Sequence, residues 1–374
     1  ACSLKVKEPI KLAEVKAENA KVGFNAKIPP SSVPVEEKIG LAVRLGEETK
    51  RLEPRIRSYT VECLDLSSLE YLYTSEGARI VQEKNYVWLR IYATGFEAGV
   101  YASASEEFGG TGGFEILDGK VEELSRNIAL RVKSQLEAAA AKAGRYPALL
   151  GPSVVGVFVH ESLGHMAEAD LALSGSILLE SMGKQIASPQ VSIYDDGCME
   201  GAFGSIMFDD EGVRCSKVTL IKNGVVVGLM HSRETAGKLG VKPTGNARAE
   251  NFRHAPLVRM RNTYLEPGDQ TLEELMEPIK FGYYLKTLRG GQVNMDGTFQ
   301  VGVQEAYEIV NGEIGRPVRN LSVSGNTLET LKRVEAVGKE FKLFPGRCGK
   351  GQIAFISDGG PPIRVSEIRI GGVV

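Results

Sequence analysis

The spacing of two histidines constrains the fold of this chain more than any other feature of its sequence. His160 and His165 lie five residues apart in the segment 156–170, GVFVHESLGHMAEAD. In a regular α-helix, positions five apart differ by roughly 140° around the axis, so the two imidazoles could not reach one metal ion. A single π-type turn returns them to one face, and Gly164 makes such local unwinding less costly. A shared metal ion therefore requires a kinked helix.

The residues before the pair indicate that this segment is buried. The run 157–159, Val-Phe-Val, is apolar and is typical of either a strand or a buried helix. In such a setting His160, Glu161 and His165 need one another or a cation as partners. The familiar zinc-peptidase pattern, His-Glu-x-x-His, is similar but has a spacing of four. We therefore favour a metal site over the alternative, in which His160 is a hydrogen-bonded core histidine and His165 ends the helix.

A catalytic zinc ion usually takes three protein ligands and leaves one position for water, so a third ligand is needed. Glu168 is three residues after His165, and Asp170 lies just beyond. Either carboxylate could ligate the metal or orient a histidine from behind. His231 and His254 are further candidates, in segments typical of the surface.

Cys348, in the loop FPGRCGKGQ, is an alternative third ligand. Arg347 and Lys350 are expected to lower the pKa of its thiol and so favour the thiolate that a metal requires. The other interpretation is a free thiol in a turn. The residues alone leave these two interpretations equal.

Hydrophobic periodicity and turn signals predict an α+β protein made mostly of antiparallel β-sheets with a few long helices. The metal motif is expected on a kinked helix packed in a β-rich domain. We expect three parts, a charged helical segment at 1–57, a central α+β domain at 58–148 and a β-rich C-terminal domain at 149–374. Long helices are predicted at 35–52 and at 120–143, where apolar residues recur at helical spacing.

Strand signals dominate the rest of the chain. An antiparallel meander is expected from Arg57 to Glu107, with a turn at Ser75–Gly77. The pairs Asn223-Gly224 and Asn311-Gly312 each predict a type I′ hairpin. The segment 144–152, GRYPALLGP, is expected to be a linker between domains.

Composition argues against several classes of protein. The net charge is −2, and no long basic run occurs, which argues against nucleic-acid binding. No apolar run approaches the roughly 20 residues that span a bilayer. The five cysteines are far apart and form no Cys-x-x-Cys pair. This pattern argues against a disulfide framework and favours a reducing cytoplasm.

A series of short motifs follows the histidine pair in a fixed order. They are HESLGHMAEAD (160–170), YDDG (194–197), DDEG (209–212), LIKNGVVVG (220–228), TGNAR (244–248), RMRNTYLEPGD (259–269) and CGKGQ (348–352). Together they resemble the TldD/PmbA family of metallopeptidases, and residues 35–150 fit that family's central domain. Family members usually carry another α/β segment before this region. We expect this chain to lack it, so that 1–57 is the remnant of a longer N-terminal domain.

The resemblance implies a zinc-dependent peptidase of the TldD branch, whose members carry His-Glu-x-x-x-His and a late cysteine. By this resemblance the Zn²⁺ ligands are His160, His165 and Cys348, and the general base is Glu161. Glu168 and Asp170 are then left to support the ligands. The implied substrates are unfolded or extended peptides. The implied assembly is a homodimer, or a heterodimer with a PmbA-like subunit that lacks the metal motif. From the composition we expect it in the cytoplasm and without direct contact to nucleic acid or membrane.

Two other functions remain open at this point. One is a non-catalytic, chaperone-like subunit that binds peptides and holds a structural metal, with Glu168 filling the water position. The other is a small-substrate amidase that resembles peptide deformylase in its two-histidine, one-cysteine metal chemistry.

Overall fold

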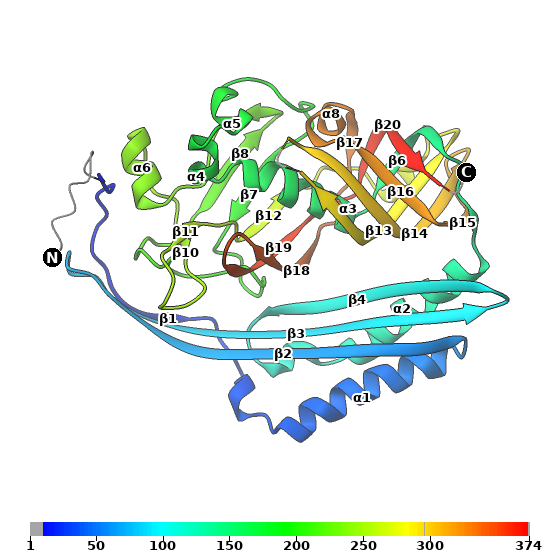
Figure 1. The fold of residues 1–374 in the computed structure, drawn as a ribbon, viewed down its shortest axis with the longest axis horizontal. Helices are drawn as coiled ribbons and strands as arrows, with labels where there is room; N and C mark the ends of the chain where they lie inside the picture. Colours follow the sequence, from blue (N-terminus) through cyan, green and yellow to red (C-terminus); the bar gives the residue numbers. More distant parts are fainter. Residues whose placement is uncertain (1–9, 295, 373–374) are drawn as a thin grey trace.

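The structure, a computed structural model, describes residues 10–294 and 296–372. The fold is α+β, as the sequence predicts, and Figure 1 shows its two layers. The lower layer is a long four-stranded sheet with two long helices. The upper layer is β-rich, and two further sheets there enclose the helix that carries the histidine pair. Within the described ranges, no helix combines the length and the apolar character needed to cross a membrane.

The lower layer is built around one long strand. Its elements are β1 (Asn19–Gly23), α1 (Val35–Leu52), β2 (Ile56–Tyr73), β3 (Arg79–Glu97), β4 (Val100–Thr111) and α2 (Lys120–Glu137). Strand β3 pairs antiparallel with β2 and β4 and parallel with β1. Because side chains alternate along a strand, Val87, Leu89 and Ile91 face the same side, where they share a core with α1 and α2. Trp88 and Arg90 face the other side, toward the upper layer.

Helix α1 and the turn between β2 and β3 lie where the sequence predicts them. Helix α2 ends earlier than predicted, at Glu137 rather than at residue 143. The reason is that Ala139–Ala140 forms a short strand, β5, that pairs with β15 (Glu313–Arg319). Pairing with another sheet thus overrides the high helix propensity of the alanine run.

One upper sheet closes on itself. Its elements are β5, β6 (Gly144–Leu150), β13 (Phe281–Val293), β14 (Thr298–Val310), β15, β16 (Leu321–Asn326), β17 (Val334–Val337) and β20 (Ile363–Gly371). Strand β13 pairs with both β6 and β14, and β20 and β16 complete the ring. The prediction of a linker at 144–152 is therefore wrong. Most of that segment is β6, whose residues 148–150 are fully buried between β13 and β20.

The other upper sheet has the strand order β18-β19-β12-β7-β8-β9. Its strands are β7 (Ile193–Asp196), β8 (Lys217–Lys222), β9 (Val225–Val226), β12 (Asn262–Leu265), β18 (Lys342–Gly349) and β19 (Ile353–Gly360). Both predicted hairpins form, β8–β9 here and β14–β15 in the closed sheet. Their Asn-Gly pairs have positive φ at both residues, as a type I′ turn requires.

Short elements complete the upper layer. They are α3 (Pro152–Val157), a π-helical segment η3 (Phe158–Gly164), α4 (Ala169–Leu173), α5 (Ile177–Glu180), α6 (Arg233–Leu239), β10 (Ala247–Arg248), β11 (Leu257–Val258), α7 (Leu272–Met276) and α8 (Thr327–Lys332). Helix α3 packs against β13 of the closed sheet and against β18 and β19 of the other. Val154, Val155, Phe158 and Val159 are buried in the main core. The histidine motif thus lies between two sheets.

The structure joins Cys198 and Cys215 in a disulfide, with Cα atoms 5.8 Å apart. Cys198 follows β7 and Cys215 precedes β8, and the register of these neighbours pairs Asp196 with Lys217. Antiparallel pairing therefore brings together two cysteines that are 17 residues apart. The expectation that the cysteines form no disulfide is wrong for this pair. The cytoplasmic location, which rested partly on that expectation, stays a prediction.

Candidate metal centre

A π turn brings the two histidines together. The backbone N–H of His165 donates to the carbonyl of His160, which is an i→i+5 bond, within the π-helical segment 158–164. The two rings lie edge to face, with their centroids 5.2 Å apart. The spacing of five residues predicts this kink, and the structure confirms it.

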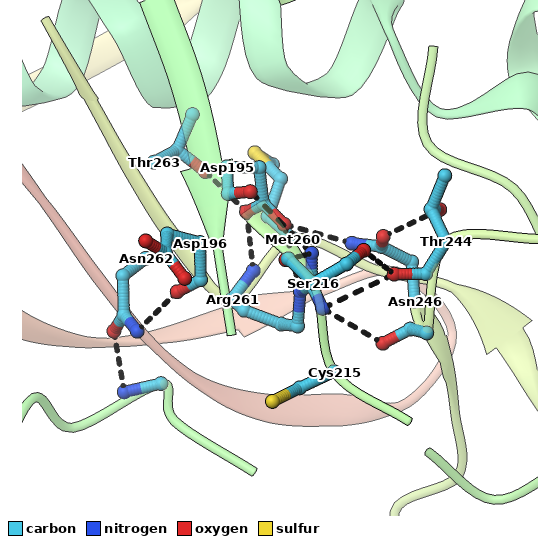
Figure 2. A network of polar contacts seen from close by, with 12 residues as sticks. Asp195, Asp196, Cys215, Ser216, Thr244, Asn246, Met260, Arg261, Asn262 and Thr263 are labelled. Carbon is cyan, nitrogen blue, oxygen red and sulfur yellow. Dashed lines mark hydrogen bonds and ion pairs between the residues drawn. The ribbon is translucent and has the colours of Figure 1, made fainter. Parts of the chain in front are cut away.

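Gly164 allows this turn to pack against the neighbouring chain. A β-carbon at this position would collide with the sulfur of Met260. Met260 is held in place on both sides, since Arg248 Nη1 donates to its carbonyl over 2.8 Å and the following residue, Arg261, is bound to Asp195. Figure 2 shows Met260 within this polar network. Any larger residue in place of Gly164 would therefore displace either the turn or the network.

Cys348 completes a cluster of three donor side chains. The ligand atoms of His160, His165 and Cys348 all lie within 4.8 Å of one another. Cys348 Sγ is 3.3 Å from His165 Nε2, close to the roughly 3.5 Å that tetrahedral zinc imposes between sulfur and nitrogen ligands. His160 Nδ1 is buried and has no hydrogen-bond partner in the described part of the chain. A cation would supply the partner that this cluster lacks.

Electrostatics in the cluster favour the thiolate. Burial raises the pKa of Cys348, but the adjacent His160 and His165 outweigh it and lower the pKa to about 5. The expected cause, two basic neighbours in the loop, is wrong. Arg347 lies over the ring of Trp88 instead, and Lys350 Nζ is bonded to carboxylates. The histidines, not the loop cations, therefore prepare the sulfur to bind a metal.

Glu168 holds the second histidine from behind. Its Oε2 lies 3.1 Å from His165 Nδ1 and 3.0 Å from Lys350 Nζ, and the side chain is fully buried. With Nδ1 committed to Glu168, Nε2 of His165 is the nitrogen that faces Cys348. Asp170 contacts none of the three donors and accepts instead from Lys350, at 2.8 and 2.9 Å. Neither carboxylate is placed as a third ligand.

Arg259 has a role in this centre that reasoning from the sequence missed. Its Nη2 donates to the carbonyl of Cys348 over 2.6 Å, and its Nη1 donates to the carbonyl of Gln352 over 2.7 Å. Its Nε lies 4.0 Å from Glu168 Oε1. The expectation of a loop at Cys348 is wrong, because Cys348 lies in β18 and pairs with Ala354 of β19. Arg259 and Lys350 therefore join this β18–β19 hairpin to the histidine segment. The motif RMRNTY was the only sequence signal for this role. Its two arginines flank an apolar residue, and the structure buries the whole run.

Glu161 occupies the open side of the cluster. Its side chain is 44% exposed, and its Oε2 lies 3.9 Å from His165 Nε2. It is thus the carboxylate that both faces solvent and reaches the nitrogen pointing at Cys348. The remaining histidines lie outside the cluster. The expected surface position is wrong for His231, which is buried beside Thr235, whereas His254 is exposed.

Family profiles match nearly the whole chain. Residues 28–143 match the profile described as the PmbA/TldA metallopeptidase central domain, and residues 143–372 match that of the C-terminal domain. A metalloprotease from Methanothermobacter thermautotrophicus is 43% identical over 348 residues, which are 92% of this chain and 76% of the relative. A zinc metalloprotease TldD homolog from Saccharolobus solfataricus is 39% identical over 343 residues, which are 91% and 77% of the two chains.

Solved structures show the same fold at lower identity. The crystal structure of a protein from Thermotoga maritima, described as a modulator of a DNA gyrase, is 24% identical with a TM-score of 0.81. The match covers 98% of this chain and 81% of that one. TldE from Thermococcus kodakarensis is 20% identical with a TM-score of 0.74, covering 96% and 80%. At these identities the likeness concerns the fold alone.

Proposed function

Because the chain belongs to the PmbA/TldA family of metallopeptidases, we propose that it is a zinc-dependent peptidase whose ion is held by His160, His165 and Cys348. The observation that carries the proposal is the π turn, which sets two imidazoles beside a thiol that is 183 residues further along the chain. Two imidazoles and one thiolate suit zinc among the common metals. One relative of this chain is itself named a zinc metalloprotease.

Glu161 is the proposed general base. A zinc ion held by His160, His165 and Cys348 would supply a Lewis acid and would lower the pKa of a bound water molecule. Glu161 is exposed on that side and accepts the proton as water adds to the peptide carbonyl. The same carboxyl then delivers the proton to the departing amine. Glu168 and Lys350 keep the ring of His165 turned so that Nε2 faces the reaction.

The position of Glu168 supports a catalytic site over a structural one. A closed structural site would need a fourth protein ligand. Glu168 was the candidate, but its Oε2 is already shared between His165 and Lys350 on the far side of the ring. The side that Glu161 faces is left for water and substrate.

We further propose unfolded or extended peptides as the substrates. Strand β18, which carries Cys348, is the last strand of the six-stranded sheet, so one of its edges is not paired within that sheet. An extended peptide laid along such an edge is recognised mainly through its backbone. A homodimer, or a heterodimer with a PmbA-like subunit, remains part of the proposal.

Metal content and turnover of three proteins test this function. We expect close to one zinc ion per chain in the wild type and a sharp loss in Cys348→Ala, measured by plasma mass spectrometry. Glu161→Gln should keep its zinc and lose at least about a hundredfold in kcat on an unstructured peptide. Zinc retained by Cys348→Ala would remove the cysteine from the ligand set. Turnover retained by Glu161→Gln would remove the proposed base.

A further inference from the structure

A cavity of about 390 Å³ lies between the two layers and adjoins the metal centre. Ser153 and Val157 line it from the helix that carries the histidines, and Glu161 follows four residues later. Arg347 lines it from β18 and immediately precedes Cys348. Asp358 lines it from β19 and interacts electrostatically with His160 and Cys348, so the cavity adjoins the metal centre.

Arginines dominate the charge of this cavity. Arg90, Arg131, Arg289 and Arg347 line it, against the carboxyl groups of Glu106, Glu107 and Asp358. When all seven groups are ionised, one positive charge is left over, and protonation of Glu107, whose pKa burial raises to about 7, adds a second. Such a cavity suits an anion, and the planar guanidinium groups of its arginines match a carboxylate.

Two of the arginines already have carboxylate partners. Arg131 Nη1 lies 2.5 Å from Glu106, and its Nε lies 3.0 Å from Glu305, whose other oxygen is bound by Lys286. The side chain of Arg90 lies 3.4 Å from Glu107. These pairs neutralise the α2 and β4 side of the cavity.

The other two arginines lack a carboxylate partner in the described ranges. Arg289 Nη2 donates to the neutral amide oxygen of Gln135 over 3.0 Å. The guanidinium of Arg347 lies over the ring of Trp88, 4.8 Å from its centroid. Both side chains are exposed and line the cavity from opposite strands, β13 and β18. Their N–H groups are free to form the charged, paired hydrogen bonds that a carboxylate accepts.

Two buried donors in the same wall form no hydrogen bond within the described residues, Trp88 Nε1 and Arg90 Nε. Arg90 Nε lies 3.4 Å from Glu107 Oε2, an ion pair without the alignment of a hydrogen bond, and Trp88 is only 4% exposed. Glu107 is close enough to Trp88 for the indole to oppose the rise in its pKa, but no hydrogen bond joins them. Burial still raises the pKa of Glu107 to about 7, which weakens it as an acceptor near neutral pH. Buried donors without an acceptor are costly, and a bound carboxylate would satisfy them.

We propose that this cavity binds one carboxylate of the peptide substrate, with Arg347 and Arg289 as the residues that determine this specificity. The inference rests on the proposed peptidase function. Asp358 lines the cavity and interacts electrostatically with His160, Glu161 and Cys348, so the recognised carboxylate lies close to the cleaved bond along the peptide. It is supplied either by an acidic side chain or by a free C-terminus.

Matched peptides test the preference in the zinc-loaded protein. Each unstructured peptide carries Glu, Gln or Lys at one position, with a free or an amidated C-terminus. We expect kcat/KM to be at least about tenfold higher for one carboxylate-bearing series than for its neutral counterpart. A preference that amidation abolishes identifies the C-terminus, and one that amidation leaves intact identifies the side chain. Equal rates for the Glu, Gln and Lys peptides with both kinds of terminus would overturn the proposal.

Variants assign the preference to the cavity. Arg347→Gln and Arg289→Gln should each reduce the ratio between acidic and neutral peptides toward one. Both side chains are exposed, so neither change should prevent folding. Arg126→Gln, an exposed arginine of α2 outside the cavity, is the matched control and should leave the ratio unchanged. An unchanged ratio in both cavity variants would refute the assignment.

A binding measurement separates this proposal from the peptidase function. Trp88 is the single tryptophan of the chain, so its fluorescence reports on the cavity alone. Titration with the preferred peptide should change this fluorescence to saturation, with an apparent Kd at least about tenfold weaker in Arg347→Gln. A saturable, Arg347-dependent change without hydrolysis would sustain the carboxylate site while the peptidase function fails. Hydrolysis whose rate and whose fluorescence change are both independent of the carboxylate would sustain the peptidase function and refute the carboxylate site.

Discussion

Two buried arginines, Arg259 and Arg261, are two residues apart on the same segment, yet they serve opposite kinds of polar cluster. Arg261 belongs to the polar network drawn in Figure 2. Among the described residues, every buried side-chain nitrogen or oxygen of this network has a hydrogen-bond partner. Its Nε pairs with Asp195 over 2.8 Å, and its two terminal nitrogens donate to backbone carbonyls. The Asp195 carboxylate also accepts from Asn246 and Thr263. Such a network fixes the register of β7 and β12.

Arg259 enters the metal centre, where hydrogen bonding is incomplete. Its own Nε, Oε1 of Glu168 and Nδ1 of His160 are buried and form no hydrogen bond among the described residues, although Nε and Oε1 form an ion pair at 4.0 Å. The difference indicates what each cluster is for. A buried polar group normally finds a partner during folding, so a complete network is structural. A cluster whose buried polar atoms lack hydrogen bonds can satisfy them by binding a ligand.

The largest expected effect comes from breaking the complete network. Asp195→Asn keeps the shape of the side chain but leaves the guanidinium of Arg261 buried without its counter-charge. We expect the free energy of unfolding to fall by about 3–5 kcal/mol in the zinc-free protein, measured by urea denaturation. Asp196→Asn is the matched control on the partly exposed neighbour and should cost about 1 kcal/mol or less. Equal losses in the two variants would contradict the structural role assigned to the network.

A smaller effect is expected where the two clusters touch. Gly164→Ala drives a methyl group into Met260 and should lower the free energy of unfolding by about 1–3 kcal/mol. Zinc stoichiometry should fall with it, because the π turn must shift. Gly40→Ala, on the exposed side of α1 with no atom within 4 Å, is the control and should stabilise slightly. A Gly164→Ala protein with full zinc would show that the turn tolerates the contact.

Within the metal centre itself, Glu168→Gln should weaken zinc binding by about ten- to a hundredfold, since the amide holds His165 and Lys350 less firmly. Competition with a chelator measures the affinity. Asp170→Asn touches Lys350 but none of the three donors, so its loss should be smaller. A larger loss of zinc affinity in Asp170→Asn than in Glu168→Gln would show that Glu168 is not the carboxylate that supports His165.

The sequence predicted the part of this site that neighbouring residues form, the histidine turn. It did not predict the part that comes from a distant segment, the cysteine. If both histidines bind one metal ion, helix geometry requires a π turn between them, and the predicted hairpins follow from the φ angles that Asn-Gly pairs adopt. By contrast, the residues could not decide between Cys348 and a carboxylate as third ligand. The decision depends on the packing of β18 against η3, across 183 residues.

The errors have the same origin. Segment 144–152 contains Gly and Pro and was predicted as a linker, but pairing with β13 and β20 makes it a strand. The pairing of Cys198 with Cys215 follows from the register of β7 and β8, which no short motif encodes. Arg259 likewise acquires its role only when its segment meets the β18–β19 hairpin that carries Cys348. Contacts between distant segments decide all three.

The smallest expected change in stability gives the sharpest test of the difference between the two polar clusters. The same substitution, Thr→Val, should have opposite effects at two positions. Thr263 Oγ1 donates to Asp195 over 3.0 Å, so Thr263→Val should remove one bond from the complete network and cost about 1 kcal/mol. Thr287 Oγ1 is buried without a partner among the described residues. Thr287→Val should therefore be neutral or stabilising, since it replaces an unsatisfied hydroxyl by a methyl group of the same shape. Urea denaturation of both zinc-free variants measures the difference. A similar cost at both positions would mean that completeness of hydrogen bonding does not distinguish structural from open polar sites in this protein.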